Sequence, residues 1–276
     1  MREKWKKTIQ LTLLLVGLVS CGQKKKTEDI PVSPVETAKI KNSNVIESTT
    51  KEELKLRVFF DAIGYGLVQP EDVPEVLAAW GVQNPKKRTK ILGIALFMTV
   101  EDKIDAAFWD DRNNVWESRP KCIEDQGRCW YVREDFTPSG NLEEKNLPGS
   151  GSRLIVLLHH SRMASFFEKH PKLASLGIGE LRLQVANGRI ELEAKAHKDA
   201  QFRNAIDAAH YWRMLAINER AHFLQSSKAA PKFFEALPKS TLEVKKNTIL
   251  FSMEGDCAMV VWSLRAIHQL YPFLRL

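Results

Sequence analysis

A short apolar run near the amino terminus limits how much of this chain is left to build a folded domain. Residues 11–19 consist mainly of Leu and Val, and they follow a basic start that runs from Arg2 to Lys7. A membrane-spanning helix needs about 20 apolar residues, and this run is roughly half as long. A basic start, a short apolar core and a small residue before a polar chain are typical of a secretory signal. We therefore expect residues 1–20 to be a signal peptide.

The run ends in Leu18-Val19-Ser20-Cys21, which resembles the lipobox of bacterial lipoproteins. The resemblance implies cleavage before Cys21, a diacylglyceryl thioether on its thiol, and a further acyl chain such as palmitate on the new amino group. An ordinary secretory signal with a chance cysteine is the alternative. Lipoproteins kept in the inner membrane commonly carry Asp after the cysteine, and Gly22 stands there instead. This favours the outer membrane facing the periplasm, with the inner membrane or the cell surface as alternatives.

A polar segment separates the expected anchor from the rest of the chain. Residues 22–52 are rich in Lys, Glu, Ser, Thr and Asn, and neither a helical nor a strand period holds in them. We expect residues 21–52 to be the lipidated cysteine and a flexible tether. Of the net charge of +7, residues 1–20 contribute +3 and residues 22–52 contribute +1. The basic balance therefore belongs partly to the signal, and nucleic acid is not an expected partner.

The remaining residues suffice for one large domain or two small ones. The Gly-, Ser- and Asn-rich stretch 140–152 is the best internal boundary. It divides a smaller α+β region, residues 53–139, from an α+β domain, residues 153–276, and the two may form one domain. A weak similarity in the order of expected elements leaves a duplicated domain as an open alternative.

The first half has the weaker secondary-structure signals. We expect helices at 53–68, 71–80 and 101–109, a strand at 90–100, and strands around Trp116 and Trp130-Tyr131. The helix at 71–80 has the clearest limits, since Pro74 lies near its start and Gly81 follows its end.

The second half has the stronger signals, above all the hairpin turn Asn187-Gly188. Counting outward from this turn gives one apolar face and one charged face, with these opposed pairs: Val185 and Ile190, Leu183 and Leu192, Leu181 and Ala194, Arg182 and Glu193, Glu180 and Lys195. A second hairpin at 241–253 turns at Lys246-Asn247 and pairs Val244 with Ile249 and Leu242 with Phe251. We also expect a strand at 154–158 and helices at 163–176, 200–225 and 256–271. The last helix turns Val260, Val261, Leu264, Ile267 and Leu270 inward.

This order of elements predicts an α+β fold with helices packed on a largely antiparallel sheet. A ferredoxin-like topology is the preferred arrangement for the C-terminal part.

Three cysteines remain after Cys21, and export would place them in an oxidising compartment. Cys122 and Cys129 are close in sequence, and a disulfide between them is the preferred interpretation. A metal site is the alternative, although two cysteines without further Cys or nearby His fall short of the ligands that zinc needs.

Cys257 follows Asp256, a candidate N-cap, at the expected start of the last helix. This position lowers a thiol pKa and favours a nucleophile. Asp-Cys at a helix start also loosely resembles the NlpC-type cell-wall peptidases, which implies Cys257 as a nucleophile. Those enzymes place a catalytic His on a later strand, whereas here only His268 follows, inside the same helix, and His159 or His160 would require a different order. A small buried residue is the ordinary alternative.

The other candidate sites are weaker. His159-His160 ends a strand, so the two rings point to opposite faces. Glu219 and His222 have Glu-x-x-His spacing, but a di-iron site needs a second copy. The acidic pairs Asp110-Asp111 and Glu134-Asp135 lack the alternating ligands of a calcium loop. We expect no cofactor and no metal.

These observations favour a membrane-anchored envelope protein with a non-catalytic binding or scaffolding domain. Its partners would be the membrane, through the lipid on Cys21, and another envelope protein or a cell-wall component. An envelope hydrolase with Cys257 as nucleophile is the alternative. A solute-binding lipoprotein is a third reading, and it would need a deep cleft between two domains.

Overall fold

A computed structural model describes residues 54–82, 91–99, 103–111, 121–162, 174–197, 202–207 and 228–274, together with residues 164, 168 and 210. The expected signal peptide, Cys21 and the tether lie outside this part, as do most of the helices expected at 163–176 and 200–225. Within the described residues, no helix is both long enough and apolar enough to cross a membrane.

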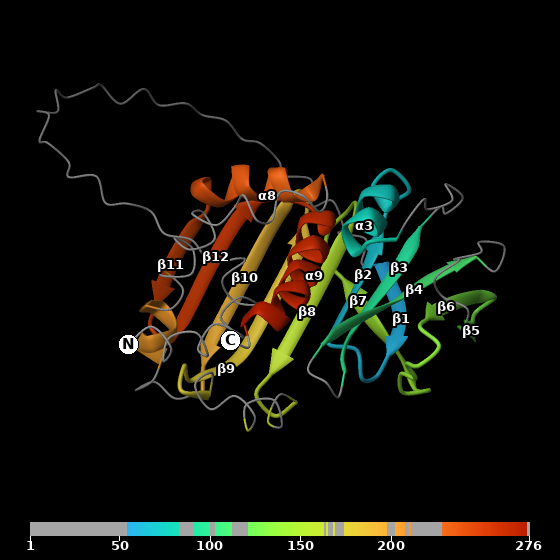
Figure 1. The fold of residues 1–276 in the computed structure, drawn as a ribbon, viewed down its shortest axis with the longest axis horizontal. Coiled ribbons are helices and arrows are strands. Elements are labelled where there is room, and N and C mark those ends of the chain that lie inside the picture. The colour runs from blue at the N-terminus through green and yellow to red at the C-terminus, as the bar shows by residue number, and fades with distance from the viewer. Residues whose placement is uncertain are drawn as a thin grey trace, which may run out of the picture.

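The core of the molecule is one ten-stranded sheet (Figure 1). In chain order its strands are β2 (Gly64–Val68), β3 (Leu92–Met98), β4 (Ile104–Asp111), β5 (Lys121–Asp125), β6 (Arg128–Val132), β8 (Arg153–His159), β9 (Ile178–Ala186), β10 (Arg189–Ala196), β11 (Thr241–Lys245) and β12 (Thr248–Glu254). Across the sheet the order is β11-β12-β10-β9-β8-β2-β3-β4-β6-β5, and every neighbouring pair is antiparallel.

Different elements cover the two faces of this sheet. The helices α3 (Val73–Trp80), α8 (Ala229–Ala236) and α9 (Cys257–Leu274) pack on the front face, and the short 3-10 helix η1 (Leu237–Lys239) follows α8. A second, two-stranded sheet of β1 (Leu54–Phe59) and β7 (Leu142–Leu147) packs on the rear face. Alternate residues of a strand pack against the two layers. In β3, Ile94 faces the helices and Ala95 faces the small sheet.

The fold is therefore α+β with a largely antiparallel sheet and packed helices, as the sequence predicts. The ferredoxin-like detail is not confirmed. In that topology another strand separates the two strands that a helix joins. Here β8 and β9 are direct neighbours, although residues 164, 168 and 174 between them are helical.

The chain follows the same path twice. From the centre outward, the first half has the order β2-β3-β4-β6-β5 and the second half has the order β8-β9-β10-β12-β11. The strands that precede each half, β1 and β7, pair with each other, just as β2 pairs with β8. The two halves are thus related by an approximate two-fold axis between β2 and β8, and they share one continuous sheet.

Two expected helices of the first half are wrong. The described residues of the first, 54–68, form β1, a turn and β2, and those of the second, 103–109, fall largely in β4. Strand β4 is buried on both faces, with Ala106 and Phe108 toward the helices and Ala107 toward the small sheet. Burial on both faces removes the polar-apolar alternation by which a strand is recognised in a sequence. The stretch 140–152, expected to be a boundary, contains β7.

The expected hairpins are confirmed residue by residue. Strands β9 and β10 pair Val185 with Ile190 and Arg182 with Glu193, and Asn187 has the positive φ of 53° that the turn requires. Strands β11 and β12 pair Val244 with Ile249. Helix α3 also ends as expected, because Gly81 adopts the left-handed conformation and its N–H bonds to a carbonyl of the last turn.

The junction between the halves leaves no room for a side chain on Gly66. Gly66 lies on β2 opposite Leu154 of β8, and a Cβ atom there would collide with the Arg153 carbonyl oxygen. We predict that Gly66→Ala lowers the free energy of unfolding by about 1–3 kcal/mol, measured by urea denaturation, because the two strands must move apart. Gly140→Ala is the matched control, since a Cβ there meets nothing within 4 Å. Equal stability of the two variants would contradict this account of the junction.

Candidate functional site

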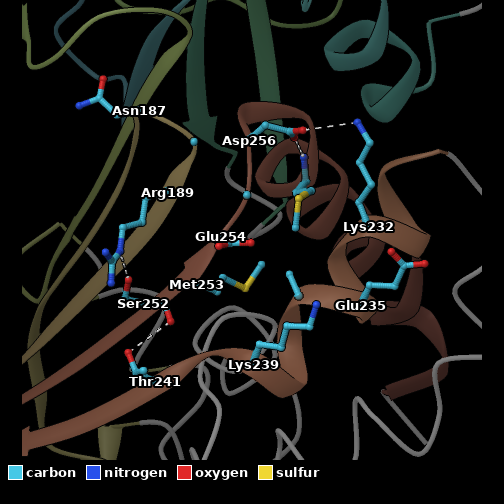
Figure 2. Close-up of a pocket in the computed structure, with 14 residues that line it drawn as sticks. Asn187, Arg189, Lys232, Glu235, Lys239, Thr241, Ser252, Met253, Glu254 and Asp256 are labelled. Carbon is cyan, nitrogen blue, oxygen red and sulfur yellow. Dashed lines mark hydrogen bonds and ion pairs between the residues drawn. The ribbon is translucent and has the colours of Figure 1, made fainter.

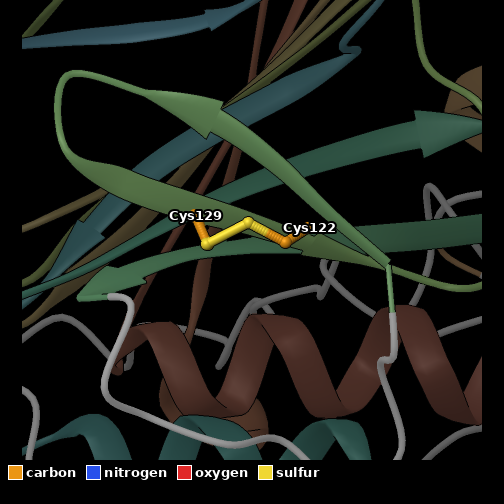
Figure 3. Close-up of a disulfide and its surroundings, with 2 residues drawn as sticks. All are labelled: Cys122 and Cys129. Atoms are coloured by element: carbon orange, nitrogen blue, oxygen red, sulfur yellow. A yellow bond between two sulfur atoms is a disulfide. The ribbon is translucent and has the colours of Figure 1, made fainter.

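The two cysteines of the outer hairpin are bonded (Figure 3). The Cys122 and Cys129 sulfur atoms are 2.06 Å apart, with 5.3 Å between the Cα atoms. The turn between β5 and β6 uses positive φ values at Gln126 and Gly127. The disulfide therefore ties β5, the edge strand on this side of the sheet, to β6.

Cys257 begins α9 as expected, but it is buried, with 2% of its surface exposed. Burial raises the pKa of its thiol well above the usual range, and the neighbouring carboxylates of Asp256 and Asp72 raise it further. Arg153 lowers this pKa, but its effect is the smallest of the four. The expected lowering of the pKa by the helix start is wrong, because loss of water outweighs it.

The candidate partner histidines lie far from Cys257. Arg153, which acts electrostatically on Cys257, begins β8, and His159 ends that strand. A strand of this length spans on the order of 20 Å, so neither His159 nor His160 comes within hydrogen-bond reach of the thiol. The side chain of His268 lies outside the described part of the chain. Neither His159 nor His160 can therefore act as the general base for Cys257.

Arg153 is itself a buried cation with a structural role. It is 2% exposed, and its guanidinium donates hydrogen bonds to the carbonyls of Gly149 and Gly151, the latter at 2.9 Å. These bonds fix the turn between β7 and β8. Burial lowers the pKa of Arg153, although two carbonyl acceptors and an ordinary value above 12 keep the group charged.

A cleft of about 800 Å³ opens where the ends of β10 and β12 meet α8 and the start of α9 (Figure 2). Its walls carry side chains of both charges together with hydroxyl and amide groups. They are Asn187, Gly188, Arg189, Lys232, Glu235, Ala236, Lys239, Thr241, Ser252, Met253, Glu254, Gly255, Asp256 and Met259.

Lys232 closes one end of this cleft and links three helices. Its ammonium lies 2.9 Å from Glu75 of α3 and 3.7 Å from Asp256, which precedes α9. The hydrogen bond to Glu75 raises the pKa of Lys232 above its usual value. Asp256 also accepts a bond from the Met259 N–H at 2.9 Å and so caps α9.

Other charged groups of the cleft are open to a ligand. Glu235, Lys239 and Glu254 are exposed and, within the described part of the chain, form no ion pair. On the sheet side, Arg189 donates to the Ser252 hydroxyl at 2.6 Å. The cleft therefore offers hydrogen-bond donors, acceptors and both charges, which suits a polar ligand.

A second hollow of about 450 Å³ continues this cleft onto the rear face of the sheet. The two hollows share Arg189, Thr241 and Ser252, so they form one groove that passes over the end of β12. The residues that line the second hollow are Arg182, Gln184, Arg189, Glu191, Leu192, Glu193, Thr241, Glu243, Leu250, Phe251 and Ser252.

The strand registers place the rear-face side chains of the second half in rows. One row crosses the sheet from Glu243 through Leu250 and Glu193 to Arg182, and the next runs from Thr241 through Ser252 and Glu191 to Gln184. All of these side chains are exposed or half-buried. We call them the open floor, which is mainly polar and is lined by charges of both signs.

The other sequence-predicted candidates do not form a site. His159 lies 3.9 Å from Glu180, and the His160 ring stacks on His197 with 4.2 Å between centroids. Glu219 and His222 lie outside the described residues. Among the acidic pairs, Asp110 is buried, whereas Glu134 and Asp135 are exposed. Within the described residues, no three metal-ligating side chains gather in one place.

Comparison with known proteins found no matching family model, no matching curated protein and no matching solved structure.

The sequence does not predict the groove, although it contains part of the pattern that forms it. The hairpin register already placed Arg182 beside Glu193 on the charged face. What the register could not show is that no described residue covers this face, while the corresponding face of the first half lies under β1 and β7.

We predict that removing the disulfide with Cys122→Ser and Cys129→Ser lowers the free energy of unfolding by about 2–3 kcal/mol, because the unfolded chain regains the freedom of that loop. Chemical denaturation with and without dithiothreitol measures this. Reductant should destabilise the wild-type protein and leave the double variant unchanged. A wild-type protein that is insensitive to complete reduction would contradict the prediction.

We also predict that the Cys257 thiol of the folded protein resists alkylation at pH 8, because it is buried and protonated. Iodoacetamide labelling of a Cys21→Ser variant, followed by mass spectrometry, should give no adduct in buffer and one adduct in urea. Rapid labelling of the folded protein would show that Cys257 is accessible and reactive.

Proposed function

We propose that this protein is a lipid-anchored component of the bacterial envelope whose folded domain binds another envelope protein or a cell-wall component without catalysing a reaction. The observation that carries the proposal is the distribution of the four cysteines. Cys122 and Cys129 are bonded, Cys257 is buried, and Cys21 follows a short apolar run in a lipobox-like sequence. A disulfide in the folded domain agrees with export to an oxidising compartment.

The groove supports binding as the task of the domain. It combines about 800 Å³ at the helix side with about 450 Å³ over the open floor, and its lining is dominated by polar and charged side chains. Such a surface suits a polar partner recognised by hydrogen bonds and charge pairs. Membrane attachment would hold this groove close to other envelope components.

The alternative, a hydrolase with Cys257 as nucleophile, is disfavoured by the geometry. A nucleophile needs access to substrate and a base within hydrogen-bond reach. Cys257 is 2% exposed, and the pKa of its thiol is raised. Arg153, which acts on Cys257, begins β8, whereas His159 ends this strand.

The membrane is part of the proposal. Gly22 in place of Asp favours the outer membrane facing the periplasm. Each buried methylene contributes about 0.8 kcal/mol, so the two or three acyl chains of a lipoprotein would hold the protein stably on a bilayer.

We predict that Cys21→Ser abolishes incorporation of labelled palmitate in cells and releases the protein from the membrane fraction, because the thiol is the attachment point. Cys257→Ser is the control and should keep both the label and the membrane location. Mass spectrometry of wild-type protein should find acylated Cys21 at the amino terminus. Persistent labelling of Cys21→Ser, or a mature amino terminus without an acyl group, would contradict the anchor.

A further inference from the structure

The small sheet of β1 and β7 covers only part of the rear face. Strand β1 lies over β2 and β3, and β7 lies over β8, so β7 is the strand nearer the second half (Figure 1). Beyond β7 the open floor of β9, β10, β12 and β11 is uncovered within the described part of the chain. The small sheet thus ends in a free strand edge beside an uncovered surface.

The register of the small sheet shows which backbone groups of β7 point outward. The Phe60 N–H donates to the Asn141 carbonyl at 2.8 Å, and these residues continue the β1–β7 register. In an antiparallel pair, hydrogen-bonded and non-hydrogen-bonded positions alternate. Leu142, Glu144 and Asn146 therefore direct their N–H and C=O groups away from β1. In the described part of the chain nothing bonds to these groups.

An extended segment beside β7 would have a surface beneath it. Strands within a sheet are about 4.8 Å apart and packed sheets are about 10 Å apart, so the next strand after β7 would lie over β9. Its inward side chains would meet Arg182 and Gln184 of β9 and then Glu191 and Glu193 of β10. Main-chain bonds to β7 and side-chain contacts with the floor would act together.

Arg182 defines the charge that such a segment should carry. Its guanidinium bonds only to the neutral amide of Gln184, at 3.2 Å, and within the described residues it forms no ion pair. Arg182 and Lys145 of β7 both lower the pKa of Tyr65, against the larger effect of burial that raises it, so each of the two cations lies near this tyrosine. Lys145 is paired with Glu143 at 2.6 Å, which leaves Arg182 as the cation without a carboxylate.

We propose that β7 binds an extended segment of a partner protein as a third strand of the small sheet, with an acidic side chain of that segment on Arg182. The proposal specifies the kind of partner that binds at the groove. It rests on the proposed binding role but not on the lipid anchor. The segment would lie along the open floor and end near the cleft at Arg189.

A second copy of this protein that pairs antiparallel through its own β7 does not fit the same place. Two β7 strands paired antiparallel would be related by a two-fold axis perpendicular to the small sheet. Both ten-stranded sheets would then lie on the same side of that layer, and each would occupy the space of the other. A single extended segment has no such conflict.

Strand β11 forms another edge, at the end of the large sheet. Its hairpin closes with the Lys245–Thr248 pair, which places the N–H and C=O of Val244 outward, and Val244 is 45% exposed. A strand added there would extend the large sheet without lying on the open floor. This edge therefore supplies a control for the experiment.

The test uses the full-length mature protein in detergent and a phage library of random twelve-residue peptides as the probe. Peptides selected on wild-type protein should share an acidic residue, and a synthetic copy of one should bind Glu144→Pro about tenfold more weakly than wild type, because proline removes an outward N–H. Glu144→Ala keeps the N–H and should bind within about twofold of wild type. Val244→Pro, which blocks the β11 edge, should also bind normally.

A second variant keeps the test independent of how β7 tolerates proline. Selection on Arg182→Glu should enrich basic residues in place of acidic ones, and the original peptide should lose about tenfold in affinity. Circular dichroism confirms that each variant is folded. Any one of three results would overturn the proposal: no enrichment on wild type, full binding by folded Glu144→Pro, or loss of binding in Val244→Pro alone. None of these results bears on acylation of Cys21.

Discussion

The antiparallel pairing of β2 with β8 is the contact on which the rest of the structure depends. It joins two halves of the same topology into one sheet, and its residues include Gly64 and Gly66, whose missing side chains let the β8 backbone approach. Because the helices and the small sheet each pack across this junction, neither layer would have a continuous surface to cover without it. The core is therefore shared between the halves, as the buried residues on both sides of the junction show.

The approximate symmetry makes the differences between the halves informative. In the first half the rear face presents Ala95, Phe97 and Trp130, which are buried by the small sheet. At the corresponding positions of the second half, the rear face presents arginine, glutamate, serine and threonine. The hydrophobic effect explains the cover over the first half. Among the described residues of the second half this face is mainly polar, with Leu250 as the apolar member of the open floor, so its exposure agrees with the polar groove for which we propose a binding role.

The parts of the fold that the sequence predicts well are those with one buried face. In the β9–β10 hairpin, polar and apolar residues alternate and a turn of two residues fixes the register, so every expected pair is confirmed. Strand β4 has apolar residues on both faces, so its sequence predicts a helix, while β7, with apolar residues only at Leu142 and Leu147, has the sequence of a linker. The site depends on β7 and on which face remains uncovered, and both are properties of tertiary packing that no local pattern carries.

The state of the cysteines connects the fold to the proposed location. In an oxidising compartment a free thiol can form a wrong disulfide, and exchange proceeds through the thiolate of an accessible cysteine. Cys122 and Cys129 lie diagonally across one hairpin, so their pairing needs only local structure. Cys257 begins the last helix and becomes buried under it, where its raised pKa keeps the thiol protonated. Among the described residues, the folded domain therefore exposes no reactive thiol that could compete with Cys21 in the attachment that we propose.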